Sequence, residues 1–321
     1  MLKLRLATAF CATLLCAASS ATSFPDRAVT LIVPQSAGSG GDVVARLLSD
    51  KIAQNLGQSV IVDNKPGANG VVAMSSVAKA RADGYTILLT GVSQMSFNPH
   101  LYATLPYDPA KDFTYVAPVV DTPFVLIASK NSGFKTLEDF ISTARKQPGD
   151  VTFSSAGKGN STHLATEMAA SQANITLQHI PYKGSAPALN AVMSGEVDVM
   201  TSVLGTALPQ ITAGAVVPLA VLAGERATDL PDVPTLKEAG LKAPPMPGWY
   251  AIVGPAGLEP DIVQRLNTAI QSALADPVID QRLRKLYFVP MQGSAQEMME
   301  RAERDSKVWG AFIAKAGLKV D

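Results

Sequence analysis

Hydrophobic positions follow first a strand pattern and then a helix pattern, starting near residue 29. Val29 to Val33 form a short, continuous run rich in β-branched residues and ended by Pro34, which is typical of a strand buried on both faces. The apolar positions then recur at steps of three and four, which predicts a helix with one apolar face formed by Val44, Leu47, Leu48 and Ile52. Asp42 is predicted to cap this helix.

The same alternation continues to the end of the chain. Apolar runs predict further strands at 59–62, 85–91, 124–129, 151–155, 178–182, 197–203, 218–223 and 249–253. Helical spacing predicts helices at 71–81, from 136, after 160, and at 185–193, 206–213, 260–274, 278–286 and 296–316. The segment 98–112, rich in proline, tyrosine and aspartate, is predicted to be a long loop. This alternation indicates an α/β fold with parallel sheets.

The loop between the first strand and the first helix contains almost no bulky side chain. Its candidate ligand-binding residues are Gln35, Ser36, Ala37, Gly38, Ser39, Gly40 and Asp42. The first N–H groups of a helix lack intrahelical partners and lie at the positive end of its dipole, so this loop is suited to an anion. Neither nucleotide motif is met, because Val43 occupies the third glycine position and no lysine follows the glycines. The alternative is a tight turn that uses glycine only for its backbone freedom.

A second strand, small-residue loop and helix occupy residues 151–168. Backbone N–H groups and hydroxyls are concentrated here, and the candidate ligand-binding residues are Ser154, Ser155, Gly157, Lys158, Asn160 and Ser161. This is not a phosphate loop, because glycine follows Lys158 where serine or threonine is required. Two such loops, one in each half, indicate a ligand held between two domains, where pockets commonly form. Ser93 and Ser202 complete the candidate set.

Charge and cysteine usage limit the class of protein. Residues 1–23 contain Lys3 and Arg5, then an apolar core, then small residues suited to cleavage, which predicts a secretory signal peptide. Without them, 25 of the 27 basic residues remain against 27 acidic ones, a net of −2 with no charged block, which argues against a nucleic-acid partner. Both cysteines, Cys11 and Cys16, lie in this segment, so disulfides cannot stabilise the exported chain.

Patterns for catalysis or metal binding are scarce. The three histidines, His100, His163 and His179, show no metal-ligand spacing, and no metal or other cofactor is predicted. The G-x-S-x-G pattern of a serine nucleophile is not met, although a serine paired with a histidine elsewhere stays open. His163 is predicted to pack or to make an orienting hydrogen bond rather than act as an acid or base, because no partner carboxylate is indicated nearby.

Several segments match the motifs of one family: FPDRAVTLIVP, AGSGGDVVAR, LGQSVIVDNKPGANG, FSSAGKGNSTHLA, HIPYKGSAPAL and LPDVPTLKEAG. Over essentially its whole exported length, the chain resembles the substrate-binding receptors of tripartite tricarboxylate transporters, the Bug family. The resemblance implies a type II periplasmic-binding-protein fold, in which two α/β lobes joined by crossover strands close on a carboxylated solute held in the cleft between them. It also implies that the two loops anchor the carboxylate, frequently through ordered water. We expect lobe 1 at 24–125 plus 245–321 and lobe 2 at 126–244.

The chain departs from the family pattern within both loops. Gln35 stands where an aromatic residue is usual, and Ser39 replaces a second glycine. Lys158 and Asn160 stand where asparagine and threonine are common. The ligand therefore cannot be assigned by analogy.

A second departure concerns the charge that the ligand can carry. Thr201 and Ser202 occupy a stretch where many relatives have an acidic residue, so a ligand ammonium would have no evident carboxylate partner. An unpaired charge buried by closure is costly. We therefore expect a dicarboxylate or an aromatic carboxylate rather than a zwitterionic amino acid, with Trp249 or Tyr182 as an apolar surface if either faces the cleft.

Three functions are compatible with these features. The favoured one is a periplasmic, monomeric receptor that captures a small carboxylate and delivers it to the membrane subunits of a tripartite transporter. The second is a receptor whose closed form docks on the outer domain of a sensor kinase. The weakest is a secreted hydrolase, because no nucleophile and base are evident.

Overall fold

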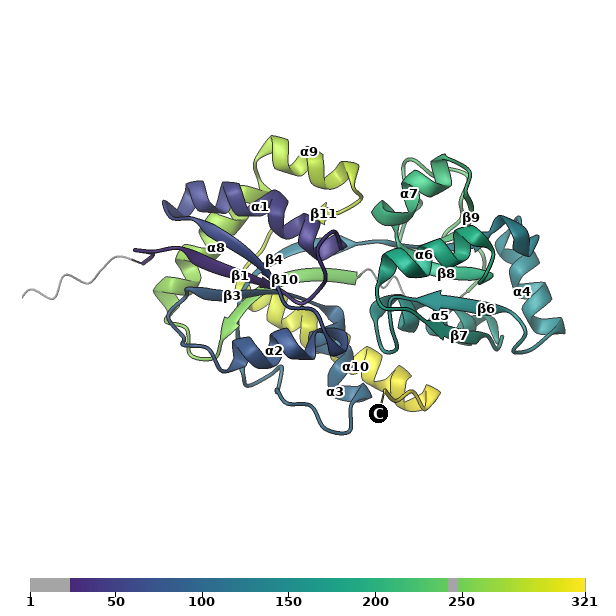
Figure 1. The fold of residues 1–321 in the computed structure, drawn as a ribbon, viewed down its shortest axis with the longest axis horizontal. Helices are drawn as coiled ribbons and strands as arrows, with labels where there is room; N and C mark the ends of the chain where they lie inside the picture. Colours follow the sequence, from purple (N-terminus) through teal and green to yellow (C-terminus); the bar gives the residue numbers. More distant parts are fainter. Residues whose placement is uncertain (1–23, 242–247, 321) are drawn as a thin grey trace, which may run out of the picture.

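The computed structural model describes residues 24–241 and 248–320. These residues form two sheets flanked by helices, and the two units lie side by side as two lobes (Figure 1). We call the unit that contains the first strand lobe 1 and the other lobe 2. The predicted two-lobed α/β fold is confirmed.

Lobe 1 contains six strands: β1 (Val29–Val33), β2 (Val60–Asn64), β3 (Thr86–Gly91), β4 (Phe113–Thr122), β10 (Gly248–Pro255) and β11 (Val289–Pro290). Their order is β11-β4-β10-β3-β1-β2. β1 is parallel to β2 and β3, whereas β10 runs antiparallel between β3 and β4. β1 is buried on both faces as predicted, because Leu31 and Ile32 pack into different apolar clusters.

Lobe 2 repeats this order with five strands: β5 (Phe124–Ser129), β6 (Thr152–Ser155), β7 (Gln178–Pro181), β8 (Val199–Val203) and β9 (Val216–Leu222). The order is β7-β6-β8-β5-β9, with β6 parallel to β7 and β8 and with β5 antiparallel between β8 and β9. β1 and β6 therefore occupy equivalent positions, each next to an edge strand of its sheet. The loops that follow these two strands occupy equivalent places in the two lobes.

Helices flank both sheets (Figure 1). Their apolar sides are buried in the clusters that cover the sheets. Those of lobe 1 are α1 (Gly40–Leu56), α2 (Val71–Ala78), α3 (Asn98–Leu101), α8 (Pro260–Leu274), α9 (Pro277–Lys285) and α10 (Ala295–Ala316). Those of lobe 2 are α4 (Leu137–Lys146), α5 (Ser161–Ala173), α6 (Ser185–Ser194) and α7 (Leu204–Thr212). Among the described residues, no helix combines the length and apolarity that a membrane span requires.

The chain crosses from lobe 1 to lobe 2 at Pro123, between β4 and β5, so the boundary expected after residue 125 lies inside β5. The return crossing expected near 244 lies in 242–247, outside the described residues. Sequence analysis missed β4, whose run is interrupted by Pro118 and Asp121. The pairing of β4 with β10 shifts register beside Pro118, and such irregularities are where a strand tolerates proline.

The segment 98–112 is only partly a loop. A π-helix at Ser93–Phe97 leads directly into α3, and irregular structure starts after Leu101. The π-helix is fully buried although it contains Ser93, Gln94 and Ser96. Buried polar side chains at the end of a central strand are unusual in a pure packing element and mark this turn for the site below.

Two further contacts join the lobes. Leu164 and Met168 of α5 pack into the lobe 1 cluster that also contains Trp309. Elsewhere, the phenol of Tyr287 in lobe 1 donates a hydrogen bond to the carboxylate of Asp229 in lobe 2. The lobes therefore touch through both apolar and polar side chains.

Candidate functional site

The first loop (residues 35–41) joins β1 to α1, and its start is held by short side-chain contacts. Ser39 is the N-cap of α1: its backbone is extended and its hydroxyl accepts a hydrogen bond from the N–H of Asp42 at 3.4 Å. The prediction that Asp42 caps the helix is therefore wrong. Asp42 is the third helical residue, and its carboxylate accepts from the N–H of Gly38 at 2.8 Å. A carboxylate in this first turn is also favoured by the helix dipole.

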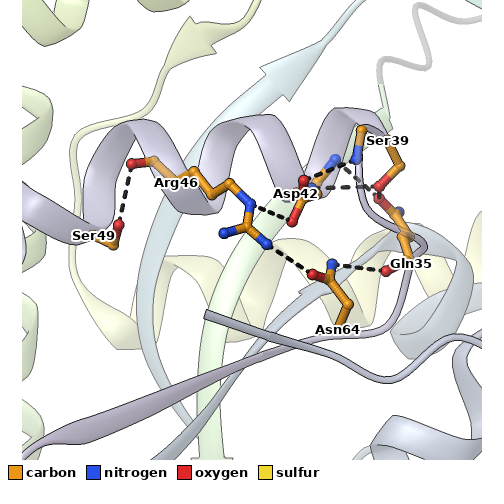
Figure 2. A network of polar contacts seen from close by, with 8 residues as sticks. Gln35, Ser39, Asp42, Arg46, Ser49 and Asn64 are labelled. Atoms are coloured by element: carbon orange, nitrogen blue, oxygen red, sulfur yellow. Dashed lines mark hydrogen bonds and ion pairs between the residues drawn. The ribbon is translucent and has the colours of Figure 1, made fainter. Parts of the chain in front are cut away.

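Asp42 belongs to a wider polar network that fixes the first loop (Figure 2). Arg46 Nε lies 2.9 Å from Asp42 Oδ1, and Arg46 Nη2 donates to Asn64 Oδ1 at 3.0 Å. Asn64 in turn donates to the carbonyl of Gln35 at 3.0 Å. Burial opposes ionisation of Asp42, but the hydrogen bonds from Arg46 and Gly38 outweigh it and lower the pKa of the carboxyl. Asp42 thus shapes the loop and is not free to bind a ligand.

Gln35 holds the loop from the opposite direction. Its Oε1 accepts from the N–H of Gly41 at 2.9 Å, and its Nε2 lies 3.3 Å from the hydroxyl of Tyr250 on β10. A Cβ atom on Gly41 would lie 2.3 Å from Gln35 Oε1, so a larger residue there would displace the Gln35 amide. Next to it, a Cβ on Gly40 would lie 3.4 Å from both the Tyr250 hydroxyl and the Phe288 ring. Tyr250 and Phe288 therefore form the floor beneath the start of α1.

The second loop (residues 155–161) joins β6 to α5 in the equivalent place. Asn160 is the N-cap, with its side-chain oxygen accepting from the N–H of Thr162 at 3.1 Å. The hydroxyl of Thr162 accepts from the N–H of Ala156 at 2.9 Å, which folds the loop back onto its helix. The first strand, loop and helix are thus repeated in lobe 2 with a different cap.

Behind the second loop lies the serine–histidine pair that the sequence left open. Ser155 Oγ is 2.6 Å from His179 Nε2, but Ser155 is 0% exposed, so its hydroxyl cannot meet a substrate in this conformation. Ser154 is also 0% exposed and donates to the carbonyl of Ala188 inside lobe 2. His163 Nδ1 accepts from the N–H of Gly159 at 3.1 Å, which confirms the predicted orienting hydrogen bond. The expectation that no carboxylate lies near His163 is wrong, because Glu167 Oε1 is 3.6 Å from its Nε2.

Both loops leave backbone donors available. In the part of the chain that the structure describes, the N–H groups of Ser36, Ala37 and Gly40 donate to no protein acceptor, and the same holds for Lys158 and Ser161. Ser36, Ala37 and Lys158 are exposed. Each loop therefore offers free N–H groups at the positive end of a helix, and the second loop adds an ammonium group. That combination binds carboxylates.

A relay of side chains connects the two loops across the lobes. Asn69, at the turn before α2, donates to the carbonyl of Gly159 at 3.1 Å and to Asn98 Oδ1 at 2.8 Å. Gln94 of the π-helix donates to the carbonyl of Asn69 at 3.0 Å and accepts from the N–H of Gly91 at 3.1 Å. A Cβ on Gly91 would lie 3.2 Å from the ring of Tyr250, which also contacts the first loop. The ends of β1, β3 and β6 are thereby brought together.

Several candidate residues lie elsewhere. Thr201 and Ser202 are 0% exposed; Thr201 accepts from Thr166 of α5, and Ser202 donates to the adjacent backbone carbonyl. Trp249 is 1% exposed, and its indole donates to Asp305 in the lobe 1 core. The hydroxyl of Tyr182 donates to Glu196 on lobe 2. Ser93 is 5% exposed and lies at the start of the π-helix.

The residues that sequence reasoning missed are Asn69, Gln94, Tyr250 and Phe288. Asn69 carried a usable signal, because it lies among glycines in a turn, where asparagine tolerates the left-handed conformation that it adopts (φ 52°). Gln94 follows Ser93 shortly after the end of the buried strand β3, where polar side chains interrupt the apolar run. For Tyr250 and Phe288 the local sequence gives no signal, because both contact the first loop from distant segments.

Comparisons with known proteins agree with this architecture. The family described as tripartite tricarboxylate transporter family receptor matches residues 44–318. The R. palustris protein Rpa4515, solved with adipate, has a TM-score of 0.87 at 33% identity, covering 92% of this chain and 99% of its own. Periplasmic binding protein BugD has a TM-score of 0.85 at 32% identity, covering 92% and 99%. MatC from Rhodopseudomonas palustris, solved with bound malate, has a TM-score of 0.84 at 30% identity, covering 90% and 99%.

The family match extends over both lobes and includes the second loop, and it starts at residue 44, just after the first loop. Two of the segments that resembled the family by their motifs, AGSGGDVVAR and FSSAGKGNSTHLA, lie at the ends of β1 and β6. The chain therefore belongs to the family of tripartite tricarboxylate transporter receptors, and is a periplasmic solute-binding receptor by family.

Proposed function

We propose that the protein captures a small dicarboxylate between the first and second loops and delivers it to the membrane subunits of a tripartite transporter in the periplasm. The observation that carries this proposal is the matched pair of loops. At equivalent places in the two lobes, each loop starts a helix and leaves backbone N–H groups without a protein acceptor. A carboxylate between them can accept from both lobes at once, so that its binding favours closure.

The charges within the loops favour an acid over an amino acid. Asp42 directly follows the first loop, in the first turn of α1, and its carboxylate is already bound to Gly38 and Arg46. Neither loop therefore offers a free carboxylate to a ligand ammonium, whereas Lys158 offers an exposed cation. Thr201 and Ser202 do not contribute to this preference, because both side chains are buried inside lobe 2.

A dicarboxylate is favoured over an aromatic acid for a separate reason. The aromatic surfaces expected for such a ligand were Trp249 and Tyr182, and these lie in the lobe 1 core and beside Glu196. Two of the similar structures contain adipate and malate, which are both aliphatic dicarboxylates.

The test is a thermal-shift panel of aliphatic dicarboxylates, tricarboxylates, aromatic acids and amino acids. A ligand present at about 100 times its dissociation constant adds roughly 2.7 kcal/mol to stability, so the dicarboxylates should raise the melting temperature clearly. If aspartate or glutamate alone raised it, the reading of the loops would be wrong. Delivery is tested separately, because uptake into proteoliposomes that contain the membrane subunits should require both the dicarboxylate and this protein.

A further inference from the structure

Three rings lie behind the second loop, one from each of three neighbouring elements. The rings of His163 on α5 and His179 on β7 are stacked with centroids 4.0 Å apart and planes at 20°. The ring of Phe153 on β6 lies 4.7 Å from His179 and 5.9 Å from His163. His163 is 4% exposed, so this group forms part of the interior of lobe 2.

Each imidazole is linked to a different glycine of the second loop. His163 Nδ1 accepts directly from the N–H of Gly159 at 3.1 Å. His179 Nε2 lies 2.6 Å from Ser155 Oγ, and that oxygen accepts from the N–H of Gly157 at 3.2 Å. Both glycines have positive φ values, 138° for Gly157 and 78° for Gly159. Glycine can adopt many backbone conformations, so this segment would be flexible without these hydrogen bonds.

The two held glycines flank Lys158. Its backbone N–H donates to no acceptor among the described residues, and its side chain is exposed. A hydrogen bond on each side fixes the direction in which this free N–H points. Pre-set donors bind an anion more tightly than donors that must first be ordered.

The contact of His163 with the second loop defines where its ring can carry a proton. His163 can accept from Gly159 only if its Nδ1 carries no proton, which leaves the proton on Nε2, 3.6 Å from Glu167. Burial, together with the neighbouring His163 and Lys158, lowers the pKa of His179 to about 3. Two imidazolium rings at this separation would also repel each other. His179 is thus neutral at neutral pH.

We propose that His163 and His179 are positioning residues that fix Gly159 and Gly157 and so present the N–H and ammonium of Lys158 to the carboxylate of the ligand. This inference rests on the proposed function, because it assumes that the second loop binds the ligand. Neither histidine touches the ligand in this arrangement, and each acts through the loop backbone.

The matched variants are His163→Asn and His163→Leu. The asparagine side chain places an acceptor close to the position of Nδ1, whereas leucine fills similar space without one. Titration calorimetry with adipate and with malate should show the dissociation constant of the leucine variant raised about tenfold or more, and that of the asparagine variant within about threefold of wild type. Equal weakening in both variants would show that the ring matters only for packing and would overturn the proposal.

Amide hydrogen exchange at Gly159 in the ligand-free protein gives an independent readout. Exchange should be faster in the leucine variant by about tenfold and unchanged in the asparagine variant, since loss of an acceptor exposes the amide. Lys158→Met serves as a control that should weaken adipate binding without changing exchange at Gly159. If wild-type protein bound no dicarboxylate, the proposed function would fail, yet exchange would still decide whether His163 holds the loop. Unchanged exchange in the leucine variant would refute the positioning role.

Discussion

Gly40 allows one N–H of the proposed ligand site to be removed with little effect on the fold. Gly40 is the first residue of α1, and its N–H donates to no acceptor among the described residues. Proline is well accepted at a first helical position, where its missing N–H has no intrahelical partner. The preceding Ser39 has φ −72° and ψ 165°, the extended conformation that proline requires of its neighbour. Gly40→Pro should therefore fold and should lack a single donor.

The expected loss of affinity follows from the charge of the ligand. A hydrogen bond from a backbone N–H to a carboxylate contributes about 1.5–3 kcal/mol, and each 1.4 kcal/mol is about tenfold in the dissociation constant. Gly40→Pro should weaken adipate or malate binding roughly ten- to a hundredfold. Gly40→Ala is the matched control, because its Cβ would lie at the same 3.4 Å from Tyr250 and Phe288 while the N–H is kept.

Titration calorimetry at fixed ionic strength gives both affinities, and thermal unfolding without ligand checks that the variants fold. The proline variant should melt close to wild type, and the alanine variant should bind within a few-fold of wild type. Wild-type affinity in the proline variant would mean that the ligand does not use the start of α1. An equal loss in both variants would mean that the added carbon, and not the missing N–H, is responsible.

Three further predictions concern stability. Chelator and reductant should leave the melting temperature of the exported protein unchanged, since the described residues contain no cluster suited to a metal and the only cysteines lie in 1–23; a fall on chelation would contradict this. Asp42→Asn should lower the free energy of unfolding by about 1–3 kcal/mol in urea titrations, because a buried carboxylate loses charge-assisted bonds to Gly38 and Arg46; an unchanged midpoint would refute its structural role. The folded pKa of His179, about 3, lies below its unfolded value of about 6.5, so the unfolded chain binds more protons in that window and stability should fall as pH drops through it. His179→Gln should flatten the urea-midpoint profile between these pH values, and an equally steep profile would argue against the assignment.

The loops could be predicted from sequence because their signals are local. A strand buried on both faces, a run of small residues and a helix with a periodic apolar face are each read from neighbouring positions, as in 29–52 and 151–168. The resemblance to one family added the two-lobed arrangement. The cap was placed wrongly because both Ser39 and Asp42 suit that role, and only the backbone conformation decides between them.

The polar environment of the site could not be predicted in this way. Thr201 and Ser202 follow a strand pattern, and this pattern does not reveal which helix covers them. In the structure, Thr166 of α5 hydrogen-bonds to Thr201. The core position of Trp249 becomes evident only from its hydrogen bond to Asp305, which lies far away in the sequence. Burial and hydrogen-bond partners are properties of packing between segments, and periodicity carries no information about them.

The sequence by itself determined the class of the fold, the two anion-suited loops and the family, because each can be recognised from local patterns of residues. The tertiary structure alone decided how those loops are held. Asn69 reaches Gly159 from 90 positions away in the chain, and Gln35 reaches Tyr250 from 215 positions away. The contact of Gln35 forms only when β10 lies in the sheet between β3 and β4, and that of Asn69 forms only when the two lobes lie side by side. Local propensity can predict where a turn occurs. The hydrogen bonds that orient its backbone come from segments that become neighbours only in the folded structure.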